Sequence, residues 1–134
     1  MMKKIALSEN HRRSVSSSIH IIEKMLIEIE NVMSNPDNGV MLKTINDMPD
    51  IDGPHYSLAI SNIKTEIKYI SEKYSLKPEE IKMSRLINSR KAKMWETVTD
   101  TNSRKLKGFK EFPKELAEEF DMDIARLKAT IDAL

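Results

Sequence analysis

The spacing of the apolar residues is the feature that most restricts what this chain can fold into. Three segments carry apolar residues alternately four and three positions apart. They are Val15, Ile19, Ile22, Leu26, Ile29 and Met33; Tyr56, Ile60, Ile63, Ile67, Ile70 and Tyr74; and Ala117, Phe120, Ile124, Leu127, Ile131 and Leu134. Because an α-helix turns by about 100° per residue, each set forms an apolar seam along one side of a helix. The pattern therefore predicts three amphipathic helices.

Capping and turn residues predict where the helices begin and end. Ser8 is a candidate N-cap, Asn35–Gly39 ends the first helix, and Pro54 suits the first turn of the second. Pro78-Glu79-Glu80 predicts the start of a less regular third helix, because acids are favourable at a helix N-terminus. The predicted helices are about 8–34, 54–75, 78–106 and 113–134. Asp121 or Asp123 could cap a new helix and so break the last one.

The connection between the first two helices is unusually long. Residues 35–53 contain two prolines and two glycines, and they exceed the usual helix–helix loop of about 2–8 residues. We expect this loop to carry function or to cross one end of the fold, with room for a short helical turn near Val40–Ile45.

These elements predict an all-α protein, an up-and-down four-helix bundle formed by one domain, residues 1–134. The seams cover about two to three heptads, fewer than most free coiled coils have, which favours bundling within the chain. A helical hairpin that completes its core by dimerising is the alternative. Six mid-seam residues are predicted to be buried close together: Ile22, Leu26, Ile63, Ile67, Ile124 and Leu127.

Several kinds of chemistry are excluded or disfavoured. The chain has no cysteine, so disulfides, thiolate metal sites and cysteine nucleophiles are excluded. It has no Glu-x-x-His, phosphate-binding loop or nucleophile elbow, and Asp50-x-Asp52-Gly53 lacks the acids of a calcium loop at both ends. We therefore expect no metal and no cofactor. Without an apolar run of about 20 residues or a secretory signal, the protein is expected to be cytoplasmic and not membrane-bound.

A basic block at residues 82–114 suggests nucleic-acid binding. It holds ten Lys or Arg residues against three acids, whereas 115–134 holds two against six. Lys and Arg side chains could contact phosphates while Trp95, Phe109 or Phe112 stacks on bases. The alternative is a solvated basic face that balances the acidic last helix. The candidate nucleic-acid-binding residues are Arg85, Arg90, Lys91, Lys93, Arg104 and Lys105.

Arg13 and His20 enclose six residues on the first predicted helix. This R-x6-H pattern resembles the arginine–histidine signature of the HEPN ribonucleases, which are helical bundles. The resemblance covers eight residues. It implies that Arg13 would bind the scissile phosphate and that His20 would act as acid or base, in a metal-independent ribonuclease. The alternative is that both side chains lie on a solvated surface.

The sequence favours a non-enzymatic protein that acts by protein–protein interaction, with a homodimer as one version. Apolar residues outside the seams support this hypothesis, since Leu58 and Tyr69 would share the back of the second helix and extend an apolar patch. Nucleic-acid binding by the basic block is the alternative, and the ribonuclease is the second alternative.

Overall fold

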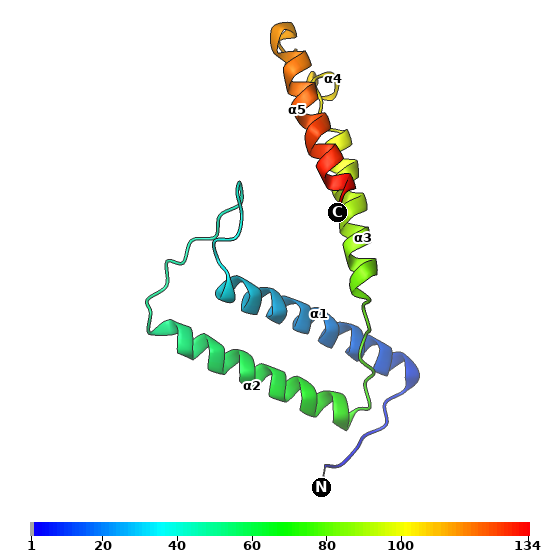
Figure 1. Cartoon of the computed structure of the whole chain (residues 1–134). Helices are drawn as coiled ribbons and strands as arrows, with labels where there is room; N and C mark the ends of the chain where they lie inside the picture. The colour runs from blue at the N-terminus through cyan, green and yellow to red at the C-terminus, as the bar shows by residue number, and fades with distance from the viewer. Residues whose placement is uncertain (1) are drawn as a thin grey trace. The chain divides into compact units, whose positions relative to one another are not determined.

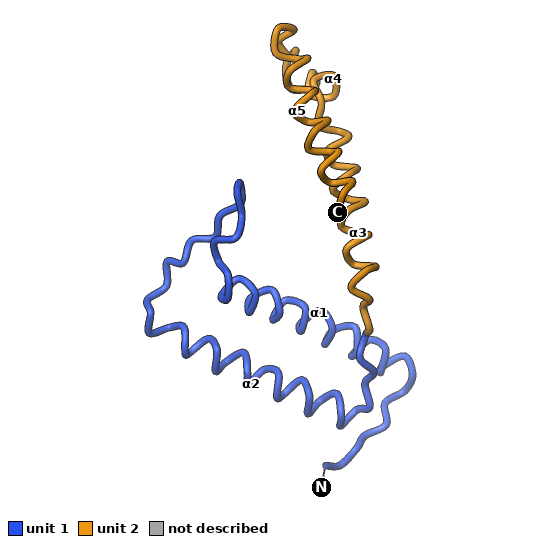
Figure 2. The backbone as a smooth tube through the Cα atoms, viewed as in Figure 1, with its two compact units in different colours: residues 1–79 blue, residues 80–134 orange. Residues whose placement is uncertain are grey.

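The computed structural model describes residues 2–134, which are 66% helical and contain no strand. The elements are α1 (Glu9–Ser34), α2 (Asp52–Lys73), α3 (Met83–Thr99), α4 (Ser103–Leu106) and α5 (Lys114–Asp132) (Figure 1). The all-α class is therefore confirmed. The chain divides into two compact units, one ending at Glu79 and the other spanning Glu80–Leu134 (Figure 2). Helices α1 and α2 pair in unit 1, and α5 packs against α3 and α4 in unit 2.

Helix α1 begins where its capping residue predicts. The Ser8 hydroxyl accepts a hydrogen bond from the backbone N–H of His11 at 3.2 Å, which satisfies a first-turn donor that has no partner within the helix. Glu9 follows, at the positive end of the helix dipole, and its carboxylate accepts a 2.6 Å hydrogen bond from Arg12. The prediction that Ser8 caps this helix is confirmed.

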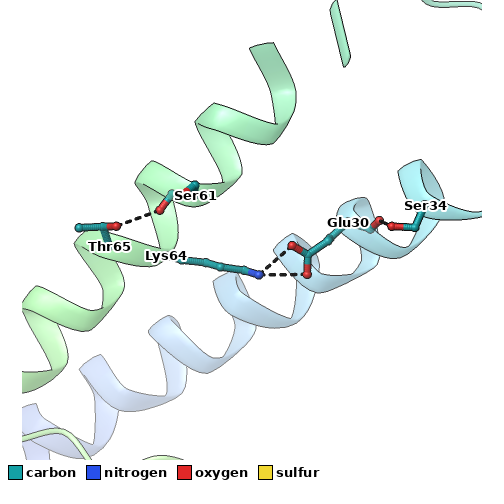
Figure 3. Close-up of polar contacts among 5 residues, drawn as sticks. All are labelled: Glu30, Ser34, Ser61, Lys64 and Thr65. Atoms are coloured by element: carbon teal, nitrogen blue, oxygen red, sulfur yellow. Dashed lines mark hydrogen bonds and ion pairs between the residues drawn. The ribbon is translucent and has the colours of Figure 1, made fainter. Parts of the chain in front are cut away.

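The α1–α2 hairpin has a narrow core. Leu26, Ile60 and Ile67 are buried together, and Ile19 and Met33 pack against them. Beside this core the ammonium group of Lys64 donates to both carboxylate oxygens of Glu30, at 2.8 and 3.0 Å (Figure 3). Both side chains are partly exposed, so this ion pair contributes at most about 1 kcal/mol. The buried seam residues are therefore the main source of the hairpin's stability.

The loop between α1 and α2 leaves its apolar residues in solvent. Its described residues contain no helical turn, so the predicted turn near Val40–Ile45 is wrong. Met41 is 96% exposed, and Val40 and Leu42 are nearly as open. A Cβ atom at Gly39 would overlap the Leu42 carbonyl oxygen. The close approach of the chain to itself at this point therefore requires glycine.

Helix α3 begins five residues later than predicted, at Met83 instead of Pro78. Lys82, which precedes it, has an extended backbone. The segment upstream is held against α1, because His20 Nε2 donates to the carbonyl oxygen of Lys77 at 3.2 Å. His20 Nδ1 also lies 3.5 Å from a carboxylate oxygen of Glu79. These contacts hold the segment outside a helix, although Pro78-Glu79-Glu80 favours a helix start.

The predicted helix 78–106 is two helices, α3 and α4, because polar side chains cap a new start. The Asn102 side chain accepts a hydrogen bond from the Lys105 N–H at 2.9 Å. Asp121 accepts from the N–H of Ser103 at 2.8 Å and from its hydroxyl at 2.6 Å. Asp121 thus caps α4, while α5 continues unbroken through residues 121–123.

The helices of unit 2 are held together more by aromatic, cation–π and hydrogen-bond contacts than by buried apolar side chains. Of its described residues only Val98 is buried. The rings of Phe112 and Phe120 lie 4.9 Å apart, and the ammonium of Lys128 lies 4.1 Å from the centre of the Trp95 ring. Lys91 donates to the backbone oxygens of Asp132 and Leu134, at 2.9 and 3.2 Å. It thereby satisfies carbonyl groups at the C-terminal end of α5.

The six-residue core predicted from the seams is only partly correct. Leu26 and Ile67 are buried, Ile124 is half-buried, and Ile22, Ile63 and Leu127 are 41 to 51% exposed. The reason is geometric: a helix with one neighbour buries only the centre of its apolar face, whereas a bundle helix has two neighbours.

Candidate interaction surface

One side of the α1–α2 hairpin is apolar and exposed. On α1 it carries Ile22, Met25 and Ile29, which are 47 to 57% exposed, and on α2 it carries Ile63. Taking about 100° per residue, these positions are rotated by about 40–100° from Leu26 on α1 and from Ile67 on α2, in the same sense. Because the two helices are antiparallel (Figure 1), the same sense of rotation turns them all to one side of the pair. We call this set the hairpin face.

The opposite side of the hairpin is mainly polar, with Ile27 as an exposed apolar residue. It carries the Glu30–Lys64 ion pair and a pocket of about 200 Å³ whose lining includes Ser16, Glu23 and Ser71. The division into a polar side and an apolar side indicates that the hairpin face is a distinct surface. An even scatter of exposed apolar residues would carry no such indication.

The back of α2 also exposes the apolar residues that the sequence singled out. Leu58 and Tyr69 are both exposed, and the ammonium of Lys73 lies 5.5 Å from the centre of the Tyr69 ring. This patch is more dispersed than the hairpin face, because the two residues stand eleven positions apart, about 16 Å along the helix.

The structure engages both residues of the R-x6-H pattern in contacts within unit 1. Arg13 lies 3.5 Å from a carboxylate oxygen of Glu9. His20 is half-buried, and its two ring nitrogens face Lys77 and Glu79. Along a straight helix their positions are about 10 Å apart on the same side. The ribonuclease hypothesis stays a prediction.

The candidate nucleic-acid-binding residues lie on two helices, and one of them, Lys91, makes a contact within unit 2. Arg85, Arg90, Lys91 and Lys93 lie on α3, and Arg104 and Lys105 lie on α4. Lys91 caps the end of α5, and Lys128 covers one face of Trp95. Sequence reasoning missed both contacts, because each depends on how α5 packs against α3. Nucleic-acid binding by the remaining residues stays a prediction.

The pKa of Asp121 is lowered below its ordinary value of 3.8, first by the hydrogen bond from the Ser103 hydroxyl and then by that from the Ser103 N–H. Both bonds favour the ionised carboxylate. Since the pKa in the folded state is depressed, the stabilisation is complete above pH 3.8 and is lost as the pH falls through the folded value.

We therefore expect the stability of unit 2 to depend on pH through Asp121. In Asp121→Asn, unfolding in urea followed by Trp95 fluorescence should change less between pH about 4 and about 2 than in the wild type. Asp123→Asn, on the exposed surface of α5, should keep the wild-type dependence. The same acid profile in both variants would contradict the capping role of Asp121.

Within residues 2–134, no group of three or more His, Asp or Glu side chains lies close enough to hold a metal ion. No helix in that range is both long and apolar enough to cross a membrane. Comparison with known protein families, curated proteins and solved structures finds none that matches this chain.

Proposed function

We propose that this chain acts by protein–protein interaction and that the hairpin face is covered by a second copy of the chain. The observation that supports the proposal is the one-sided exposure of Ile22, Met25, Ile29 and Ile63 beside a core of only three buried residues. Contiguous apolar surface of this kind marks contact sites, because water contact with it is unfavourable.

This proposal follows the alternative to the single-chain bundle, a helical hairpin that completes its core by dimerising. Two hairpins that cover one another's hairpin faces would give each helix two neighbours. The width of the apolar face of α1 supports this, because Ile21, Met25 and Val32 are exposed well to one side of Leu26. In a single hairpin this apolar face stays exposed to solvent.

Sedimentation velocity at micromolar concentration tests the proposal, and we expect a homodimer. Met25→Glu should raise the dimer dissociation constant at least about tenfold, because a charge buried without a partner costs more than 1.4 kcal/mol. The matched control is Ser17→Glu, which adds the same charge on the far side of α1, where Ser17 is exposed. A strict monomer would refute the homodimer, and equal weakening by both variants would refute the hairpin face as its interface.

A further inference from the structure

An open apolar groove runs between α3 and α5 in unit 2. It has a volume of about 370 Å³, and its floor is formed by Met94, Val98, Ile124, Leu127 and Ile131. Arg90, Lys93 and Thr97 line it from α3, and Thr101 lines it from just beyond the end of α3. A groove of this size and lining resembles a ligand site more than a packing defect, since such sites combine apolar walls with a few polar groups.

The charge at this groove has one sign. No acidic residue lines it, and in the part of the chain that the structure describes, neither Arg90 nor Lys93 forms an ion pair. Two acids of α5 adjoin lining residues in sequence, Asp123 and Asp132, and neither lines the groove. Asp123 pairs with Arg126 at 3.1 Å. The two cations are therefore open to an external carboxylate.

The dimensions fit a helix. The lining on α3 runs from Arg90 to Val98, which are eight residues apart, and this corresponds to about 12 Å or just over two helical turns. A surface between two paired helices with an apolar floor is where an amphipathic helix docks, presenting apolar residues at i, i+3, i+4 and i+7. Met94 in the floor adapts readily to different partner side chains, because its side chain is flexible and polarisable.

We propose that the α3–α5 groove binds an amphipathic helix of a partner protein whose apolar stripe is flanked by carboxylates. The stripe would cover Met94 and Leu127, and the carboxylates would pair with Arg90 and Lys93. A nucleic acid fits this groove less well, because phosphates gain nothing from an apolar floor and Lys128 already covers one face of Trp95. This site does not depend on the homodimer, which uses α1 and α2.

The test uses the full chain and two synthetic helical peptides of about five turns. Both peptides carry leucines at i, i+3, i+4 and i+7, with glutamates beside the stripe in one and lysines in the other. Anisotropy of a dye on the peptide gives the affinity, and circular dichroism confirms that each variant is folded. We expect the glutamate peptide to bind at least about tenfold more tightly than the lysine peptide.

Charge reversal then locates the site. In the double variant Arg90→Glu, Lys93→Glu the preference should invert in favour of the lysine peptide. The matched control is Arg104→Glu, Lys105→Glu, which changes the charge equally on α4, outside the groove lining, and should keep the wild-type preference. Equal affinity for both peptides would overturn the proposal, as would inversion in the control. A single-stranded DNA oligonucleotide that displaces the glutamate peptide, and loses binding in the Arg90, Lys93 variant, would assign the groove to nucleic acid instead.

Discussion

Leu26→Ala should destabilise the α1–α2 hairpin by about 2–5 kcal/mol, which is a large part of the stability of a small domain. Leu26 is the most buried side chain described, at 5% exposure, and it packs with Ile60 and Ile67. With only three buried residues in this core, little neighbouring structure is available to refill the cavity. Urea unfolding followed by far-ultraviolet circular dichroism measures the loss.

The control for this variant is Lys24→Ala, an exposed position on the opposite side of α1. It should change the stability by no more than about 0.5 kcal/mol. Trp95, the only tryptophan, lies on α3, so fluorescence reports unit 2 and should change little in Leu26→Ala. Equal unfolding midpoints for the two variants would show that the seam assigned to α1 is in the wrong register.

Val98→Asp should abolish the pairing of α3 with α5. Val98 is 6% exposed and is the buried centre of unit 2, so the new carboxylate would replace an apolar side chain that lies between α3 and α5. An unpaired buried charge costs several kcal/mol. The measurement is the Trp95 emission maximum, which should shift to longer wavelength as Lys128 and α5 separate from the ring.

Ala92→Asp is the matched control, because it places the same side chain on the same helix at an exposed position. The helix-propensity cost is larger in the control, at most about 0.7 kcal/mol, because alanine is the best helix former and valine ranks close to aspartate. A greater loss of stability in Val98→Asp therefore reflects the burial of Val98. If Val98→Asp destabilises the protein no more than Ala92→Asp does, Val98 is not the point where α3 and α5 meet.

The sequence predicted the elements well where the signal is local. Ser8 is the N-cap of α1, and the seam residues Leu26, Ile60 and Ile67 are the ones that meet in the hairpin core. Both follow from interactions within a few residues or from helical periodicity. The same periodicity overestimated burial at Ile22 and Ile63, because it shows which side of a helix is apolar but not how many neighbours cover that side.

The remaining features depend on contacts between segments far apart in the sequence. The start of α3 is displaced to Met83 because His20, 57 residues before Lys77, holds the preceding segment. The sequence predicts Arg90, Lys91 and Lys93 alike as candidate nucleic-acid-binding residues. In the structure Lys91 is turned to the end of α5, whereas Arg90 and Lys93 border an apolar groove. Adjacent basic residues look alike in a sequence, and only the packing of α5 distinguishes them.

The helix pairs described above also bear on how fast the chain folds. Each pairing joins helices close in the sequence, α1 with α2, α3 with α5, and α4 with α5. The entropy cost of closing the intervening loops grows only slowly with their length, and helical proteins with such local contacts fold in microseconds to milliseconds. Synthesis proceeds at about 5–20 residues per second. The α1–α2 hairpin therefore has time to form and to expose its apolar side on the ribosome, several seconds before α5 has been translated.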